Sequence, residues 1–192
     1  YTAWDCTSPV FVKENGKTDD YKTWSSVLNF PLWAHYGENG EGVALVFELD
    51  QLIESCKKIV KDDWAIFYDE VKYPLTLEEF ELPFTFDLDI MEDKSNEGFL
   101  KYAFERATKL WSHKNHLWSY ENEYRIMMYS EEENPISINI EKSLKAVVFG
   151  SKVSNVVKEI ISQYCMNHDI EMHFVEFDEL TNNYLLYPHN FV

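Results

Sequence analysis

The C-terminal third of the chain passes from the periodicity of a strand to that of a helix and back. Residues 145–150, Lys-Ala-Val-Val-Phe-Gly, form an apolar run that is typical of a buried strand ending in a turn. Residues 171–177 have strand character again. Between them, apolar residues recur at helical spacing, and they are Val153, Val156, Val157, Ile160, Ile161 and Tyr164. This order and length favour a right-handed crossover between parallel strands.

Earlier segments extend this pattern to a mixed α/β (α+β) domain, with one central mixed sheet and helices packed on it. Because the chain starts at Tyr1 and not at Met, we expect a single domain over residues 1–192 whose N-terminal part is incomplete. The further predicted elements are strands at Val43–Phe47, at 65–73 and from Glu123 onward, a helix with Asp50 as its N-cap, a helix over 97–114, and a hairpin partner at 136–140.

Composition limits the classes of function. Apolar residues make up 45% of the chain, enough for a sizeable core, while 17 basic and 34 acidic residues give a formal charge of −17. This charge disfavours free duplex DNA, whose binding depends on phosphate neutralisation, and it suits a basic protein partner. Three cysteines far apart predict reduced thiols, and no apolar run reaches the length of a membrane helix, so a cytoplasmic protein is expected.

The segment Trp118–Ile126 places two acids and a base among aromatic residues. If the chain is extended from Glu123, its side chains alternate, so Glu123 and Arg125 share one face. Glu121 joins that face if the extended geometry begins two residues earlier. Such charges are costly to bury without partners. The strand therefore holds a structural ion pair or presents a carboxylate to a ligand.

His35 and Tyr36 end the segment Leu32-Trp-Ala-His-Tyr, directly before a glycine-rich turn that leads into a predicted strand. Loops in this position often carry catalytic groups. His35 could donate a hydrogen bond to a sugar hydroxyl, carry a proton or ligate a metal, or it could bond a backbone carbonyl at a helix end. The glycines precede the strand and are interleaved with acids, so they predict a turn and not a dinucleotide site; they are Gly37, Gly40 and Gly42.

Metal sites are poorly supported by the spacing of ligands, and we expect no metal. The chain has no His-Glu-x-x-His or Cys-x-x-Cys motif. His113 and His116 are three residues apart, but no third ligand is evident, so capping or solvated histidines are favoured. Most of the six tryptophans are expected in the core. Trp33 and Trp118 stand beside the polar segments, where an indole could stack on a flat ring such as nicotinamide or adenine.

Five sequence blocks together resemble the bacterial domain-of-unknown-function family numbered 2971, whose members pair a WAHY turn with a later YE.EYR strand. The similarity spans roughly residues 28–165, and the N-terminal part usual in that family is absent or altered here. The blocks are Leu32–Gly37, Gly42–Phe47, Val71–Tyr73, Lys114 with Trp118–Arg125, and Leu144–Gly150.

The arrangement is also similar to some ADP-ribosyltransferases, which implies NAD as the substrate. Breaking the nicotinamide–ribose bond develops oxocarbenium character, and a fixed carboxylate stabilises that charge. By this resemblance, Glu123 is the catalytic acid with Glu121 as substitute, His35 holds the ribose or nicotinamide, Tyr36 or Tyr73 stacks on the nicotinamide, and Arg125 orients the acid or contacts the pyrophosphate.

This resemblance predicts a bacterial toxin or defence effector that modifies a protein or nucleic acid and is restrained by an antitoxin or another inhibitory partner. One alternative is a non-enzymatic binding or regulatory domain, in which Glu121, Glu123 and Arg125 form a structural network. The third is a His/Glu hydrolase or nuclease, whose activity would depend on a metal.

Overall fold

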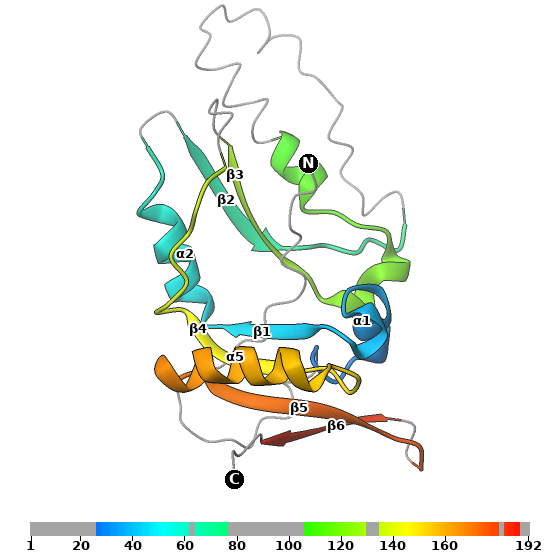
Figure 1. Ribbon diagram of the computed structural model, residues 1–192. Helices are drawn as coiled ribbons and strands as arrows, with labels where there is room; N and C mark the ends of the chain where they lie inside the picture. Colours follow the sequence, from blue (N-terminus) through cyan, green and yellow to red (C-terminus); the bar gives the residue numbers. More distant parts are fainter. Residues whose placement is uncertain (1–25, 62–63, 77–105, 130–134, 181–182, 189–192) are drawn as a thin grey trace, which may run out of the picture. The chain divides into compact units, whose positions relative to one another are not determined.

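The computed structural model describes residues 26–61, 64–76, 106–129, 135–180 and 183–188 (Figure 1). These residues belong to two compact units. The four-strand unit takes the described residues of Ser8–Ala65 and Tyr129–Val192, and the two-strand unit takes those of Ile66–Met128. The architecture is the predicted mixed α/β class, with a central mixed sheet of four strands.

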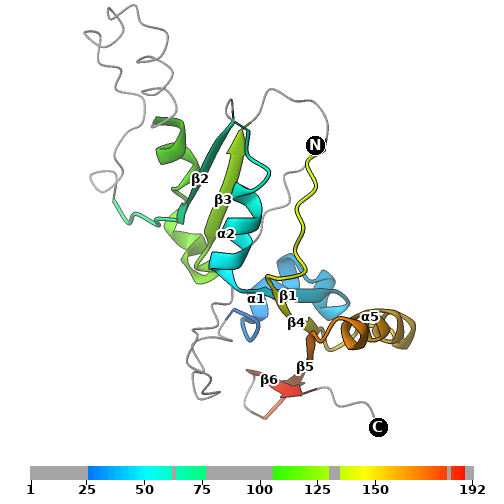
Figure 2. The same cartoon turned by 90° about the vertical axis from the view of Figure 1, so that its left-hand side faces the viewer.

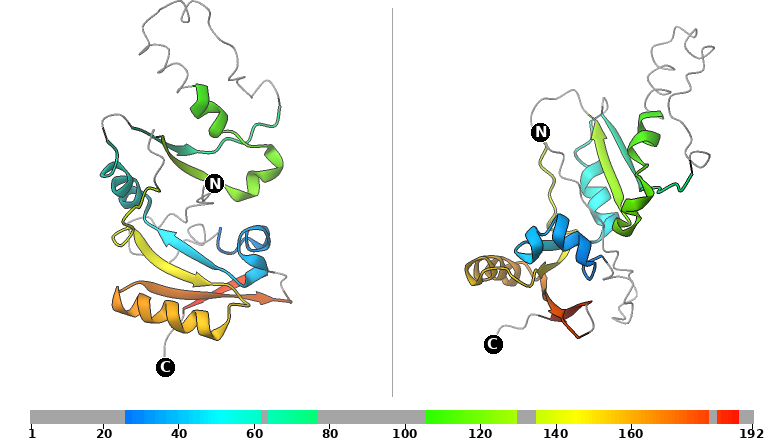
Figure 3. Two further views of the ribbon diagram at one scale, coloured as in Figure 1. Left: turned by 45° about the horizontal axis from the view of Figure 1, so that its top comes forward. Right: turned by 90° about the vertical axis from the view of Figure 1, so that its right-hand side faces the viewer.

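The central sheet has the strand order β1-β4-β5-β6. β4 and β5 are parallel, whereas β1 pairs with β4 and β6 pairs with β5 in antiparallel fashion. Helix α5 connects the two parallel strands, which confirms the predicted strand–helix–strand segment, and it lies along β5 in Figure 3. The bounds are Val43–Phe47 for β1, Leu144–Phe149 for β4, Asn155–Asn167 for α5, Glu171–Asp178 for β5 and Asn183–Pro188 for β6.

Helix α5 begins after Ser154, whose hydroxyl accepts a hydrogen bond from the Val157 backbone N–H at 3.4 Å. The side of α5 that is buried carries small residues, Ser162 and Cys165, which allow a close approach to the sheet. The predicted apolar face is buried only in part. Val153 is buried and Ile161 packs against the core, but the exposed members are Val156, Val157, Ile160 and Tyr164.

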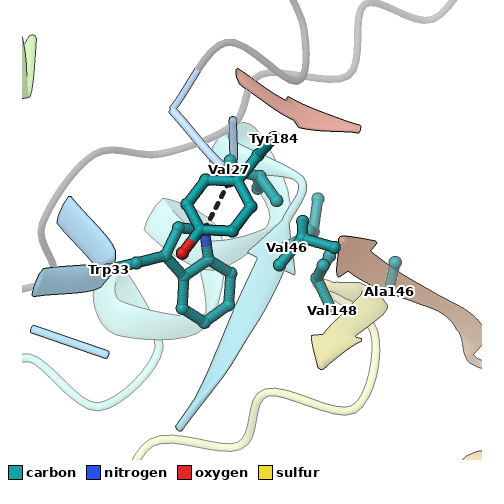
Figure 4. Close-up of a cluster of buried hydrophobic side chains, with 7 residues drawn as sticks. Val27, Trp33, Val46, Ala146, Val148 and Tyr184 are labelled. Carbon is teal, nitrogen blue, oxygen red and sulfur yellow. Dashed lines mark hydrogen bonds between the residues drawn. The ribbon is translucent and has the colours of Figure 1, made fainter. Parts of the chain in front are cut away.

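The core of this unit lies on both faces of the sheet, because β4 is buried on both sides. One cluster, shown in Figure 4, surrounds Trp33, whose indole Nε1–H donates to the Val27 carbonyl at 2.6 Å. Its other members are Val46, Ala146, Val148, Val175 and Tyr184. The second cluster lies on the α5 side and consists of Leu144, Val147, Phe149, Val153, Cys165 and Ile170.

The predicted glycine-rich turn follows helix α1 (Phe30–His35) and contains the short helix η1 (Glu38–Gly40). It packs backbone against backbone on the end of β4. The Gly42 carbonyl accepts from the Gly150 N–H at 3.0 Å, and a Cβ on Gly150 would lie 2.2 Å from the Gly40 oxygen. Gly40 also has a φ of +93°, which favours glycine. The glycines are therefore explained by close packing.

Helix α2 spans Leu49–Lys57, and its N-cap position is Glu48, two residues earlier than predicted, so Asp50 lies in its first turn instead of at its N-cap. A charge in that turn still complements the helix dipole. Cys56 and Cys165 are buried free thiols, while Cys6 lies outside the described residues. Among the helices that the structure describes, none is both long and apolar enough to span a bilayer.

The two-strand unit contains β2 (Ala65–Glu70) paired with β3 (Tyr124–Tyr129), and Figure 2 shows them side by side. The expected hairpin partner of β3 at 136–140 is wrong, because those residues form no strand and β2 takes the pairing position. Of the predicted helix over 97–114, the described part is helical over 106–111. The short helix η2 (His116–Glu121) leads into β3.

Candidate functional site

A cluster of two acids and two bases forms where η2 turns into β3. Glu121 is the last residue of η2, and Asn122 adopts the left-handed conformation, with φ 47° and ψ 51°, before β3 begins. The extended geometry therefore begins after Asn122, and the condition under which Glu121 would share the strand face of Glu123 is not met. The turn nevertheless buries both carboxylates, since Glu121 is 0% and Glu123 is 3% exposed. Asn115 supports the start of η2 by accepting from the Leu117 N–H at 2.9 Å.

Arg125 holds the Glu123 carboxylate with two hydrogen bonds. Its Nε donates to Oε1, and its Nη2 donates to Oε2 at 2.9 Å. Its remaining nitrogen, Nη1, donates to the Trp111 carbonyl, which ties the guanidinium to the helix at 106–111. The predicted proximity of Glu123 and Arg125 on one face is thus confirmed. A bidentate pair of this kind combines charge with a fixed geometry.

Lys114 is the second base, and it joins the two acids. Its Nζ forms an ion pair with Glu121 Oε2 and lies 3.5 Å from Glu123 Oε2. The same Nζ is 5.0 Å from the centroid of the Trp118 ring, within the range of a cation–π interaction. Sequence reasoning placed Lys114 in a motif block without giving it a role. The sequence feature that could have pointed to Lys114 is its position four residues before Trp118, in the same block as the two acids.

The segment 71–73 forms hydrogen bonds with the backbone of Glu123. The Val71 N–H donates to the Glu123 carbonyl at 2.8 Å, and the Glu123 N–H donates to the Tyr73 hydroxyl at 2.9 Å. Burial raises the pKa of the Tyr73 phenol above its ordinary value, and the neighbouring carboxylates of Glu123 and Glu121 add to that effect. Tyr73 is therefore a partner of the predicted acid.

The cluster is electrically balanced, with two carboxylates facing one guanidinium and one ammonium. Buried charges are tolerated when they are paired and hydrogen-bonded, and removal of one partner leaves an uncompensated charge. Trp118 and Tyr120 lie at its edge, with ring centroids 6.0 Å apart. The two-strand unit thus brings together five of the predicted site residues, which are Glu121, Glu123, Arg125, Tyr73 and Trp118.

The other predicted site residues belong to the four-strand unit. Trp33 is 4% exposed and occupies a core position, with its indole N–H already bonded to Val27. His35 is exposed at the end of α1, and its ring centroid is 6.2 Å from that of Tyr36, which is also exposed. His35 and Tyr36 are therefore on the surface, whereas Trp33 is part of the packing that supports them.

The histidines of the two-strand unit bond backbone carbonyls. His113 Nδ1 contacts the Lys109 carbonyl, and His116 Nδ1 lies 3.3 Å from the Tyr73 carbonyl. Within the described ranges, no group of three or more His, Cys, Asp or Glu side chains is arranged to hold a metal ion. His113 thus bonds a carbonyl in the last turn of its own helix, whereas the exposed His116 bonds the segment 71–73.

Comparison with known families gives a match to the model described as "Protein of unknown function (DUF2971)", over residues 32–126. This range begins at α1 and ends within β3, so it includes Trp33, His35 and the acid–base cluster. The resemblance that the sequence blocks carry is thereby confirmed for about half of the chain. No curated protein and no solved structure matches the chain.

Proposed function

We propose that this chain, which belongs to the DUF2971 family over residues 32–126, is a binding or regulatory domain built around a structural acid–base network. The observation that carries the proposal is the pair of hydrogen bonds from the Arg125 guanidinium to Glu123, which engage both oxygens of the carboxylate. A carboxylate that stabilises an oxocarbenium-like ribose must direct an oxygen at the ligand. With both oxygens bonded inside the protein and the residue 3% exposed, Glu123 has the surroundings of a structural group.

The backbone contacts of Glu123 support the same role. Its N–H and C=O both bond to the segment 71–73, and its side chain bonds to Arg125 and contacts Lys114. One residue therefore links β3 to two other stretches of the unit. Paired residues of this kind fix a single arrangement of neighbouring segments, because any other arrangement leaves a charge buried without a partner.

The substitution Glu123→Gln tests the structural role. It keeps the shape of the side chain but leaves Arg125 and Lys114 with one acid fewer, so the free energy of unfolding should fall by about 3–5 kcal/mol. Glu48→Gln is the matched control, since Glu48 pairs with Lys145 at 2.9 Å on a more exposed surface. That change should cost less than about 1 kcal/mol. Equal stability of the two variants in urea denaturation would contradict the proposal.

A second candidate is the ADP-ribosyltransferase-like toxin or defence effector, with NAD as substrate. It is favoured by the convergence of Glu123, Arg125, Tyr73 and a partly exposed Trp118 in one cluster. In this mechanism Glu123, or Glu121, would stabilise the developing positive charge on the ribose.

Labelled NAD distinguishes the two candidates. The intact protein and the Glu48→Gln control should both transfer label to lysate components if the chain is a transferase, whereas Glu123→Gln should not. The reaction is run well below the melting temperature of the least stable variant, and folding is checked by circular dichroism. Absence of transfer by the intact protein, or transfer that survives Glu123→Gln, rejects the enzymatic candidate.

A further inference from the structure

Among the strands that the structure describes, β6 is the last of the four-stranded sheet. β5 pairs with one side of it, and no other strand of the described chain pairs with its second side, as Figure 1 shows. The β6 sequence, Asn-Tyr-Leu-Leu-Tyr-Pro, contains no charged side chain. Natural edge strands are usually protected from further pairing by charges, bulges or prolines, and here Pro188 stands only at the end. Such an edge can accept an additional strand from another chain.

An apolar shelf adjoins this edge on one face of the sheet. Tyr187 is paired with Phe174 of β5, and their rings stack with centroids 5.2 Å apart. Leu185 is paired with Glu176 on the same face. Leu185 and Tyr187 remain 39% and 37% exposed, whereas Tyr184 on the opposite face is buried in the core. An added strand would therefore cover two apolar side chains that are accessible to solvent.

The charges around the apolar shelf indicate what kind of partner it would bind. No Lys or Arg occurs after Lys158, while the same stretch contains six acidic residues. Three of them lie at the end of β5, which pairs with β6, or directly after it, and they are Glu176, Asp178 and Glu179. This surface attracts a basic chain and repels another copy of a protein with a formal charge of −17. Charge complementarity thus favours a basic partner over self-association.

We infer that the β6 edge binds an extended, basic segment of another protein, which adds to the sheet as a fifth strand. Its apolar side chains would pack on Leu185 and Tyr187, and its Lys or Arg side chains would lie near Glu176 and Asp178. The backbone hydrogen bonds supply affinity, while the acidic border supplies selectivity and a dependence on salt. The site uses no residue of the acid–base cluster, so it stands independently of the function proposed above.

Two synthetic peptides test the inference. One is Lys-Lys-Thr-Val-Tyr-Val-Thr-Lys-Lys, and the other has Glu in place of every Lys. Fluorescence anisotropy should detect binding of the basic peptide alone, and its affinity should fall as salt is raised. Hydrogen exchange should show new protection of the β6 amides at 183–188. Leu185→Lys should weaken binding by about tenfold, because it removes an apolar contact and adds a like charge.

Leu45→Lys is the matched control, since Leu45 is an exposed leucine of β1, at the opposite edge of the same sheet. It should leave the affinity unchanged, whereas Glu176→Lys combined with Asp178→Lys should weaken it without touching the apolar shelf. The inference is overturned if the basic peptide fails to bind or the acidic one binds equally. It is also overturned if Leu45→Lys acts like Leu185→Lys, or if ultracentrifugation shows a dimer of the protein that Leu185→Lys dissociates.

Discussion

Lys114→Met isolates the contribution of the lysine that joins the two buried acids. The Lys114 ammonium lies 3.5 Å from Glu123 Oε2 and pairs with Glu121, which is fully buried. Coulomb's law at that distance gives about 5 kcal/mol for one pair at an effective dielectric constant of about 20. Partial exposure of the ammonium and the cost of desolvating it reduce that value. We therefore expect a loss of about 3–5 kcal/mol in the free energy of unfolding.

A double-mutant cycle in urea denaturation measures this coupling directly. Glu121→Gln in the Lys114→Met background removes the unpaired charge, so the double variant should be more stable than Lys114→Met alone. Lys57→Met is the control, because Lys57 pairs with Glu54 at 2.9 Å on the surface. It should cost less than about 1 kcal/mol. A loss below about 1 kcal/mol for Lys114→Met, or a double variant no more stable than it, would refute the reasoning.

Three further substitutions test other parts of the structure. Tyr73→Phe should flatten the decline of the free energy of unfolding above about pH 10, because the native protein keeps the phenolic proton to a higher pH than the unfolded chain does, and this stability is lost as the pH rises through the raised pKa; urea titrations from neutral pH upward measure the slope. Gly150→Ala should lower the melting temperature, with a cost of about 1–3 kcal/mol or more, since its Cβ would meet the Gly40 oxygen; a variant as stable as the wild type would contradict the close packing. Trp33→Phe should cost about 1–3 kcal/mol by leaving the Val27 carbonyl without its donor, and thermal unfolding monitored by circular dichroism checks it.

The sequence predicts best those parts of the fold in which a single pattern of apolar residues continues through a whole strand or helix. The apolar run of β4 and the segment after it define a parallel crossover because few other arrangements bury such a strand on both faces. The packed side of α5 was harder to identify, because Ser162 and Cys165 are small residues that contribute little to an apolar count. β6 was not predicted at all, since its character depends on pairing with β5.

In the candidate site, too, contacts between residues close in sequence can be predicted, whereas contacts between distant segments cannot. Glu123 and Arg125 are two residues apart, so strand geometry alone predicts that they meet. Tyr73 is 50 residues from its partner Glu123, and no local pattern can reveal such a contact. It depends on the parallel bridge between Lys72 and His113, which sets the 71–73 segment beside the helix that precedes Lys114. The bridge therefore places the Tyr73 hydroxyl and the Val71 N–H on the backbone of Glu123, whereas the charge partners of both acids, Lys114 and Arg125, come from the same local stretch of chain as the acids.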